Sequence, residues 1–274
     1  MIQKTDNVEN QNHGGFLNVN QLKYLAAVFM VLDSAFYAIH GIFPSWIHLI
    51  TRFVSPLFAF LLVEGFFHTR DRKKYMFRLW TAAILMEAGD ILSQFLLGSR
   101  NAITDNIFLS LAVGFTVIYL FSAAKECEEA GKRKLLFFSG VVILLAGCVF
   151  SVIPIMIGDF MFGLEGGLQV LSVILVFYLF YGNRKKQVIV FLIVNAVFLF
   201  MQGSLVLPSA DYSSLSIWFD DFCYNSDWMT FLFLPFVFLY NGQKGSKSSF
   251  NKYFFYILYP AHLWLLHIIA YCMK

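Results

Sequence analysis

The sequence is dominated by a series of apolar runs, several of which continue for about 20 residues. A helix rises about 1.5 Å per residue, so a run of that length crosses about 30 Å of hydrocarbon. A helix also satisfies its own backbone hydrogen bonds in lipid, whereas unbroken apolar runs lack the alternation of a barrel strand. With 59% hydrophobic and 14% charged residues, the chain has more apolar surface than one soluble core could cover. The sequence therefore predicts an all-α, polytopic membrane protein.

Runs and breakers predict a bundle of about nine transmembrane helices in one domain at 21–274, after a polar disordered tail at 1–20. The tail lacks the charged-then-apolar order of a signal peptide, so the first run is expected to be a retained span. The segment 215–227 is expected either to extend the short eighth span or to lie in the interface as a half-helix. The predicted spans are 21–42, 46–68, 78–97, 106–124, 135–157, 160–181, 188–207, 228–241 and 253–272.

Basic residues lie almost entirely in alternate loops, which predicts the orientation of the bundle. Under the positive-inside rule, these loops face the cytoplasm. An odd number of spans then places the N-terminus inside and the C-terminus outside. The opposite set of loops holds only Arg100, and its one sizeable member is 208–227. The basic groups are Arg70 to Arg78, Lys125 to Lys134, Arg184 to Lys186 and Lys244 to Lys252.

Overall charge and cysteine content exclude several other classes of protein. The formal charge of +3 and its loop distribution give no support for nucleic-acid binding, and the expected surroundings are membrane lipid. The four cysteines form no Cys-x-x-Cys pair and no cluster with histidine at metal-ligand spacing. We therefore interpret them as buried or incidental thiols and expect no metal.

Ionisable residues inside the predicted spans each cost at least about 2.5–3.5 kcal/mol on insertion scales, so each needs a partner or a task. Arg52 and Glu64 are about 18 Å apart along one helix, so each must find its partner on another helix. For Arg52 the expected partner is Asp33 or Asp90. These residues either form buried ion pairs that fix helix packing or build a functional site. They are Asp33, Arg52, Glu64, Glu87, Asp90, Asp159, Glu165, His262 and His267.

Six stretches in or beside the predicted spans, which contain most of these polar residues, follow one another in a distinctive order: LKYLAAVFMVLD at 22–33, RFVSPLFAFLLVEGFFHTR at 52–70, NIFLSL at 106–111, GDFMFGLEG at 158–166, LPFVFLYNG at 234–242 and YFFYILYPAHL at 253–263. Together they resemble the TraX family of membrane acetyltransferases. The last two are the most specific, because they resemble the family's Tyr-Asn-Gly turn and Tyr-Pro-x-His-Leu span. The resemblance covers most of residues 22–270.

The resemblance implies a pilin-type amine acetylase, distantly related to the membrane acyltransferases that use cytoplasmic acetyl-CoA. The expected reaction moves acetyl to an amine of a pilin-like or other peptide, or to a hydroxyl such as one on a glycan, at the bacterial cytoplasmic membrane. The family pattern places His directly after the Asp of the first span, whereas this chain has Ser34 after Asp33. Activity therefore depends on another base.

Amine acetylation needs a base, an oxyanion stabiliser and a cationic clamp for the CoA phosphates. On the resemblance, we expect His262 to act as base or acyl relay, oriented by Asp33 or Asp90. Arg52 is expected to stabilise the oxyanion or to pair with an acidic neighbour. Glu64 is expected to face the same bundle interior as these four residues, because isolated charges facing lipid are too costly.

The predicted CoA site lies at the cytoplasmic mouth of the second and third spans, where Arg suits phosphate geometry. Its predicted members are His68, Arg70, Lys73, Lys74 and Arg78. The rival interpretation is a non-catalytic polytopic protein, either a transporter or a pilus- or secretion-associated scaffold. Transport is disfavoured because the chain shows no inverted repeat and no paired broken helices.

Overall fold

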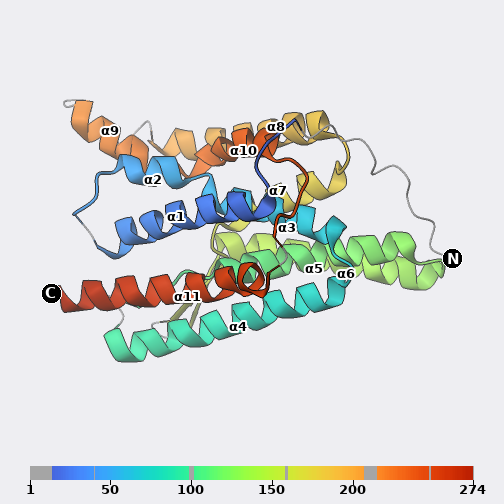
Figure 1. Ribbon diagram of the computed structural model, residues 1–274, viewed down its shortest axis with the longest axis horizontal. Coiled ribbons are helices and arrows are strands. Elements are labelled where there is room, and N and C mark those ends of the chain that lie inside the picture. The colour runs from blue at the N-terminus through green and yellow to red at the C-terminus, as the bar shows by residue number, and fades with distance from the viewer. Residues whose placement is uncertain are drawn as a thin grey trace.

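The computed structural model shows an elongated helix bundle whose longer helices run side by side along the longest axis of the molecule (Figure 1). It describes residues 14–39, 41–98, 102–157, 160–206, 215–246 and 248–273. The helices are α1 (Val19–Ala38), α2 (Trp46–Thr51), α3 (Val54–His68), α4 (Arg72–Leu97), α5 (Ile107–Glu126), α6 (Ala130–Val152), α7 (Gly167–Leu179), α8 (Arg184–Val206), α9 (Leu215–Tyr224), the 3-10 helix η2 (Asp227–Phe233), α10 (Leu234–Leu239) and α11 (Ser249–Cys272).

The helical fold class is confirmed over the described residues, with one small departure. Two three-residue strands, β1 (Ile155–Ile157) and β2 (Phe160–Phe162), form an antiparallel hairpin between α6 and α7. By length and composition, four helices of the described chain can cross a membrane, or five if the bent pair formed by α9 and η2–α10 counts as one span. The chain is thus a membrane protein, while the count of about nine crossings and the orientation stay predictions.

Several helices begin before the start of the predicted span. α4 and α11 begin at Arg72 and Ser249, several residues before the predicted starts at 78 and 253. Hydropathy marks only the apolar part of a helix, whereas the helix itself continues through polar and cationic residues that reach water. The predicted span at 160–181 differs in the opposite direction, because β2 and a loop take up its first part and leave α7 short.

Polar caps set where several helices begin. A capping box joins Asn18 and Gln21 at the start of α1, with N–H to side-chain distances of 2.9 and 3.0 Å. Asp71 accepts a hydrogen bond from the Lys74 N–H at 2.9 Å, and Asn106 caps α5 in the same way. The turns that precede α1, α4 and α5 are therefore fixed by local sequence.

The described end of the predicted tail is attached to the bundle. The Leu17 N–H donates to the Leu239 carbonyl oxygen at 2.9 Å, and the Leu17 carbonyl accepts from the Asn241 N–H at 2.9 Å. Contact with the bundle thus begins before residue 21, where the membrane domain is predicted to start. The tail residues 1–13 lie outside the described part of the chain.

Packing separates an interior group of helices from an outer group. α1 packs on α2, α3 and α11, while α3 and α5 pack on α7, and their interface is rich in buried aromatic rings. The outer helices α6 and α8 expose large apolar side chains such as Phe138 and Phe200, as lipid-facing helices do. Buried aromatic residues of the core include Phe60, Phe66, Phe115, Phe177, Phe191 and Phe233.

Most of the basic residues lie at one end of the bundle, in the loops there or in the first turns of the helices that follow those loops, and we call this end the basic end (Figure 1). Helices α3, α5 and α7 end there and α4, α6 and α8 begin there. α1 and α11 begin further in, which leaves a recess between them and their neighbours. The loops of the basic end are 69–71, 127–129, 180–183 and 240–246.

Candidate functional site

Arg52 lies at the break between α2 and α3, and two carboxylates from other elements hold its guanidinium. Nη2 donates to Asp33 Oδ1 at 2.6 Å, and Nη1 donates to Asp227 Oδ1 at 2.8 Å. Nε donates to the His48 carbonyl oxygen at 2.9 Å. Of the two predicted partners of Arg52, the structure selects Asp33, and Asp90 takes no part. With all three nitrogens engaged, the guanidinium has a fixed orientation.

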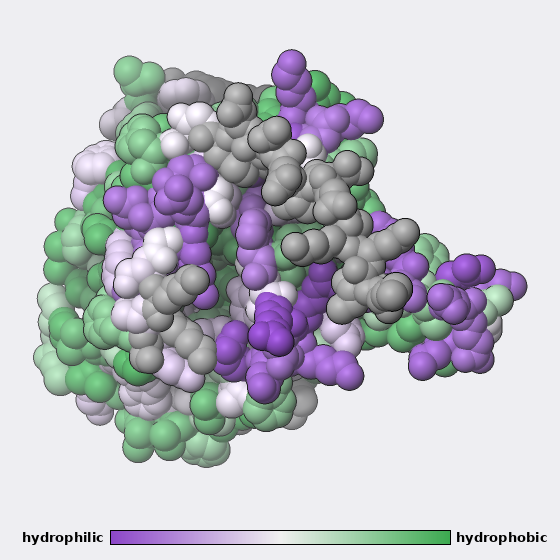
Figure 2. Space-filling model, turned by 45° about the vertical axis from the view of Figure 1, so that its right-hand side comes forward, coloured by the Kyte–Doolittle hydropathy of each residue, from purple (hydrophilic) through white to green (hydrophobic). Residues whose placement is uncertain are grey.

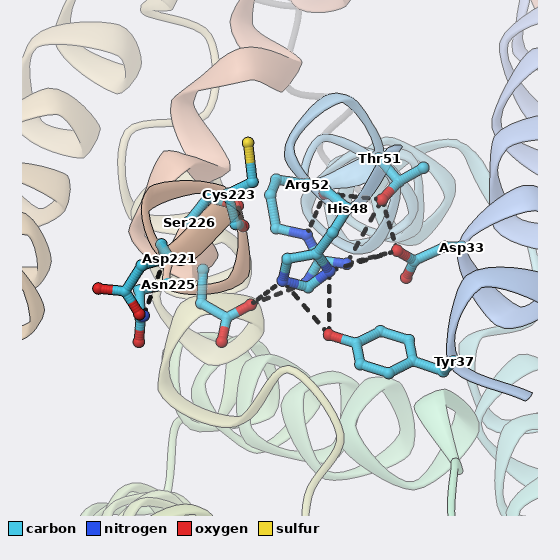
Figure 3. Close-up of polar contacts among 10 residues, drawn as sticks. Asp33, Tyr37, His48, Thr51, Arg52, Asp221, Cys223, Asn225 and Ser226 are labelled. Atoms are coloured by element: carbon cyan, nitrogen blue, oxygen red, sulfur yellow. Dashed lines mark hydrogen bonds and ion pairs between the residues drawn. The ribbon is translucent and has the colours of Figure 1, made fainter. Parts of the chain in front are cut away.

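His48 completes this network from a fully buried position (Figure 3). The Tyr37 hydroxyl lies 2.9 Å from His48 Nδ1, and Thr51 donates its hydroxyl hydrogen bond to Asp33. The imidazole nitrogens lie 3.7 Å from the Asp33 carboxylate and 3.5 Å from that of Asp227, beyond ordinary hydrogen-bond distance. The ring therefore lies beside the ion pairs without a direct hydrogen bond to either acid, and Arg52 is the main partner of both Asp33 and Asp227.

A cavity of about 510 Å³ opens onto this network, and we call it the distal cavity because it lies away from the basic end. It is bounded by α1, the α2–α3 break, the start of α7 and the start of η2. Besides the ion network, it receives the side chains of Ser34, Glu165 and Tyr259. A cavity of this size holds a small substrate or a peptide end.

His262 of α11 lies directly behind the distal cavity and is hydrogen-bonded through both ring nitrogens. Nδ1 is 2.9 Å from the Leu258 carbonyl oxygen, and Nε2 is 3.0 Å from Ser34 Oγ. Only 5% of the residue is exposed. His262 itself does not line the distal cavity, whereas Ser34 does. The predicted base is thus connected to the cavity through Ser34.

A second polar pair closes the wall of the distal cavity beside α11. The Tyr259 hydroxyl donates to Glu165 Oε2 at 2.6 Å and accepts from the Ile107 N–H at 3.2 Å. Glu165 belongs to the loop before α7. Burial, together with the nearby charge of Asp105, raises the pKa of the Glu165 carboxyl to about 8.

At the basic end, the recess between α1, α3, α4 and α11 holds a second cavity, of about 330 Å³, which we call the basic cavity. Figure 2 shows hydrophilic residues gathered around a hollow at this end, with hydrophobic residues on the flanks. Four of its cationic side chains come from three parts of the chain, namely the start of α1, the stretch that leads into and begins α4 and the loop before α11, so folding brings together charges that are far apart in sequence. These are Lys23, Arg70, Arg78 and Lys244.

Glu64 belongs to the basic cavity and not to the distal cavity. Its Oε1 accepts from Arg184 Nη2 at 3.0 Å, and only 3% of its side chain is exposed. The expectation that Glu64 pairs with another helix is confirmed, since Arg184 begins α8. Glu64 faces the bundle interior as expected, but it lies in the basic cavity while Asp33 and Arg52 line the distal cavity, because the long axis of α3 separates the two ends.

A small apolar cavity of about 70 Å³ lies between the two polar cavities, and we call it the connecting cavity. It shares Lys23 and Tyr75 with the basic cavity and shares Met30 and Tyr259 with the distal cavity. Its other walls are apolar side chains of α3, α4, α5 and α11. The three cavities therefore follow one another through the interior of the bundle.

The remaining predicted site residues divide into those that line a cavity and those that do not. His68 and Arg70 line the basic cavity, as does Arg78, whose buried Nε has no hydrogen-bond partner in the described chain. Lys73 and Lys74 are exposed outside it. Their positions in the first turns of α4 direct them away from the recess.

Asp90 of α4 lies apart from Arg52 and from His262. Its Oδ1 is buried and has no hydrogen-bond partner among the described residues. The charges that act most strongly on Asp90 are those of three other acids, Glu87, Asp105 and Glu165. Asp90 therefore belongs to an acidic region beside the distal cavity. Orientation of His262 by Asp33 or Asp90 is not observed, because the Leu258 carbonyl performs that function.

Sequence reasoning missed several members of both cavities. Lys244 enters the sequence analysis only as a basic loop residue that indicates orientation, and neither Lys23 nor His48 is among the predicted site residues. Asp227 is the last residue of the predicted outer loop. Its position as an acid directly before an apolar span could have marked it as a candidate partner for Arg52. Asp159, another predicted intramembrane acid, lies outside the described residues.

The described residues contain no group of three or more His, Cys, Asp or Glu side chains that could hold a metal ion. All four cysteines are free thiols. The basic cavity offers cationic side chains, and the distal cavity offers a fixed guanidinium and a serine hydroxyl that is hydrogen-bonded to an imidazole behind it.

Comparison with known proteins supports the resemblance to the TraX family. The profile of the TraX protein family matches residues 18–270. The chain is also similar to the "Probable fimbrial assembly protein FimC, serogroup H1" of Dichelobacter nodosus, with 28% identity over 269 residues, 90% of this chain and 93% of that protein. No solved structure matches the chain. With the family profile covering nearly the whole bundle, this chain belongs to the TraX family.

Proposed function

We propose that this protein is a membrane acetyltransferase that takes acetyl from acetyl-CoA bound at the basic end and transfers it to an acceptor in the distal cavity. The observation that carries this proposal is the succession of three cavities through one bundle. A cationic chamber, an apolar passage and a chamber with acid–base groups match the three parts of such a reaction: nucleotide binding, passage of the acyl arm and chemistry.

The basic cavity fits the phosphates of CoA. Lys23, Arg70, Arg78 and Lys244 converge on it, and the unpartnered Nε of Arg78 has a hydrogen bond left to donate. Charge-assisted hydrogen bonds from Arg and Lys are the usual means of holding phosphate groups. His68 contributes a half-exposed imidazole at the rim. Lys73 and Lys74 are left out of the proposed site because both point away from the cavity.

The distal cavity supplies the chemical groups. His262 serves as the general base, with its ring orientation fixed by the Leu258 carbonyl. Arg52 stabilises the oxyanion that forms on the acetyl carbonyl, and its position is held by Asp33 and Asp227. A fixed donor costs no reorganisation when charge develops.

The connecting cavity suits the thin and mostly uncharged arm of a thioester. Its volume of about 70 Å³ is too small for a nucleotide, and its walls are apolar except for the Lys23 stem and three tyrosines. The arm can therefore pass while the charged nucleotide stays at the basic end. This arrangement would place the acetyl group beside Tyr259 and the distal cavity.

We propose a pilin-like peptide amine as the acceptor, on the strength of the relative described as a fimbrial assembly protein. A peptide hydroxyl or a glycan hydroxyl is the alternative acceptor of the same cavity. Apolar outer helices that face membrane lipid and the TraX assignment support placement in a bacterial cytoplasmic membrane. The basic end then faces the cytoplasm, where acetyl-CoA is made, under the positive-inside rule.

The competing function is a non-catalytic pilus or secretion scaffold, which the word "assembly" in the relative's description favours. A scaffold needs buried ion pairs such as Asp33–Arg52 for helix packing. It does not need His262 as a base, so catalytic turnover separates the two functions.

The direct test is acetyl transfer by the purified full-length protein in detergent, with radiolabelled acetyl-CoA and a pilin-like peptide that has a free amine. His262→Ala should lower turnover by about 10²–10⁴-fold, the usual contribution of general acid–base catalysis. Leu265→Ala, at an exposed position on the same helix α11, is the control and should keep turnover. No transfer by the wild-type protein to any amine or hydroxyl acceptor would favour the scaffold.

A further inference from the structure

Ser34 occupies the position directly after Asp33 where the resemblance to the family places a histidine. The structure gives this substitution a new meaning, because Ser34 Oγ lies 3.0 Å from Nε2 of His262. The two residues come from α1 and α11, which pack side by side, and are 228 residues apart in sequence. A serine hydroxyl and an imidazole at this distance form a nucleophile and its base in many acyl-transfer sites.

The other hydrogen bond of His262 fixes the direction of proton transfer. Nδ1 is 2.9 Å from the Leu258 carbonyl oxygen, which can only accept, so Nδ1 carries the proton. In the neutral ring, Nε2 then presents its lone pair, and the Ser34 hydroxyl donates to it. The backbone carbonyl thus does for His262 what a carboxylate does in a catalytic triad: it holds the tautomer in which the far nitrogen is a base.

The distal cavity reaches Ser34 but not the imidazole. Ser34 lines the cavity together with Arg52 and Tyr259, whereas His262 lies behind it and is almost completely buried. A reactant in this cavity therefore meets the serine hydroxyl first. Direct removal of a proton from an acceptor by His262 would require the ring or the serine to move, while transfer through Ser34 requires no rearrangement.

The end of the connecting cavity lies close to the same serine. Met30, one turn before Ser34 on α1, lines both the connecting cavity and the distal cavity, as does Tyr259, whose ring contacts the His262 ring at 5.6 Å between centroids. An acyl group that arrives through the apolar passage therefore enters the distal cavity next to the Ser34–His262 pair.

We propose that Ser34 carries the acyl group as an ester intermediate, with His262 as its base; this inference rests on the proposed acetyltransferase function. In the first step, Ser34 Oγ attacks the thioester carbonyl and its proton passes to His262 Nε2. The carbon–sulfur bond breaks, the thiolate takes the proton from Nε2, and free CoA leaves with acetyl-Ser34 formed.

In the second step, the acceptor amine attacks the ester carbonyl of acetyl-Ser34 and gives a proton to His262 Nε2. The bond between the acyl carbon and Ser34 Oγ breaks, and Oγ recovers the proton from Nε2. The products are the acetylated amine and the original serine, so protons and bonds balance over the two steps. Arg52, fixed in the same cavity, stabilises the oxyanion in both.

The simplest competing explanation is that the Ser34–His262 hydrogen bond only holds α1 against α11. The test is to incubate the full-length protein with radiolabelled acetyl-CoA and no acceptor, then map the label. Wild type should carry acetyl on the peptide containing residue 34, as an ester released by alkaline but not by neutral hydroxylamine. Ser34→Cys should carry it as a thioester that neutral hydroxylamine releases.

Ser34→Ala should carry no label and should lose at least about 10²-fold of turnover, while Ser172→Ala, a matched serine inside α7, should behave as wild type. Elution and melting profiles of the Ala and Cys variants establish that both are folded. If Ser34→Ala keeps full turnover while His262→Ala loses it, the ester intermediate is wrong and the proposed function stands. If the wild type transfers acetyl to no acceptor, the proposed function itself fails.

Discussion

The basic cavity and the distal cavity use charge in opposite ways. In the basic cavity, cations from several segments converge without matching acids, and the one buried acid, Glu64, already belongs to Arg184. In the distal cavity, the single cation Arg52 lies between Asp33 and Asp227, and further acids stand nearby. An excess of positive charge attracts and binds an anion, whereas a balanced network holds one guanidinium in place. The charges of the basic cavity therefore suit the binding of an anion, and those of the distal cavity suit the precise orientation of Arg52.

The largest expected effect comes from removing the centre of the balanced network. Arg52→Ala leaves two carboxylates close together without their cation, and breaking a buried pair costs about 3–5 kcal/mol. Asp227 is about half exposed, so the loss of unfolding free energy should lie near the lower end of that range. Thermal unfolding in detergent measures it, and turnover should fall along with stability.

The matched control is Lys74→Ala, which removes an exposed ion pair with Asp71 outside both cavities. It should change neither stability nor turnover measurably, because solvent screens such pairs. Equal losses in the two variants would mean that the distal network is no more than another surface pair, and the contrast between the two cavities would disappear.

An intermediate effect is expected from the basic cavity. Arg78→Gln removes a buried donor to the CoA phosphates, and hydrogen bonds from charged groups contribute about 1.5–3 kcal/mol, which corresponds to about 10-fold or more in affinity. The KM for acetyl-CoA should rise by that factor while kcat stays nearly constant, since the interaction is made equally in the ground and transition states.

Lys73→Gln, a loss of the same charge at an exposed neighbour outside the cavity, should leave the KM unchanged. A fall in kcat with no change in KM for Arg78→Gln would instead place Arg78 in the chemical step and blur the distinction between binding and chemistry.

The smallest effect concerns the pH dependence of stability. The pKa of Glu165 is raised from its ordinary value of 4.5 to about 8, chiefly by burial. A raised carboxyl pKa means that the folded state prefers the neutral form, so stability is highest below the ordinary value and falls as pH rises towards 8. The melting temperature should decline over this window.

Glu165→Gln stays neutral, so its melting temperature should decline less between about pH 5 and pH 8 than that of the wild type. Glu128→Gln, at an exposed position between α5 and α6, should follow the wild type. Parallel curves for all three proteins would show that Glu165 is ionised and solvated, contrary to its place in the wall of the distal cavity.

The sequence predicts the helical segments well and the cavities only in part. Apolar runs locate the helices because lipid demands continuous hydrophobicity, and the cost of intramembrane charge identifies Asp33, Arg52 and His262. Which charges share a cavity depends on helix rotation and depth, which hydropathy does not contain. Glu64 shows the limit, because its position on α3 places it at the opposite end from Arg52.

Ser34 shows a different limit of sequence reasoning. Compared with the family pattern, it looks like the loss of a histidine, and the sequence offers no sign that His262 lies beside it. The contact depends on α1 and α11 starting at similar depths and packing together, which only the fold determines. Lys23 and Lys244 were overlooked for the same reason, since their cavity exists only once α1 and the loop before α11 meet.

Transfer of acetyl through the bundle, from the basic end to the distal cavity, is the central claim, and sided proteoliposomes test it most directly. Acetyl-CoA, which does not cross the bilayer, is enclosed with the protein, and the acceptor peptide is added outside. Molecules with the basic end inward should acetylate the outside peptide, and Arg78→Gln should slow this at limiting acetyl-CoA. Acetylation only when acetyl-CoA and peptide are on the same side would contradict the claim.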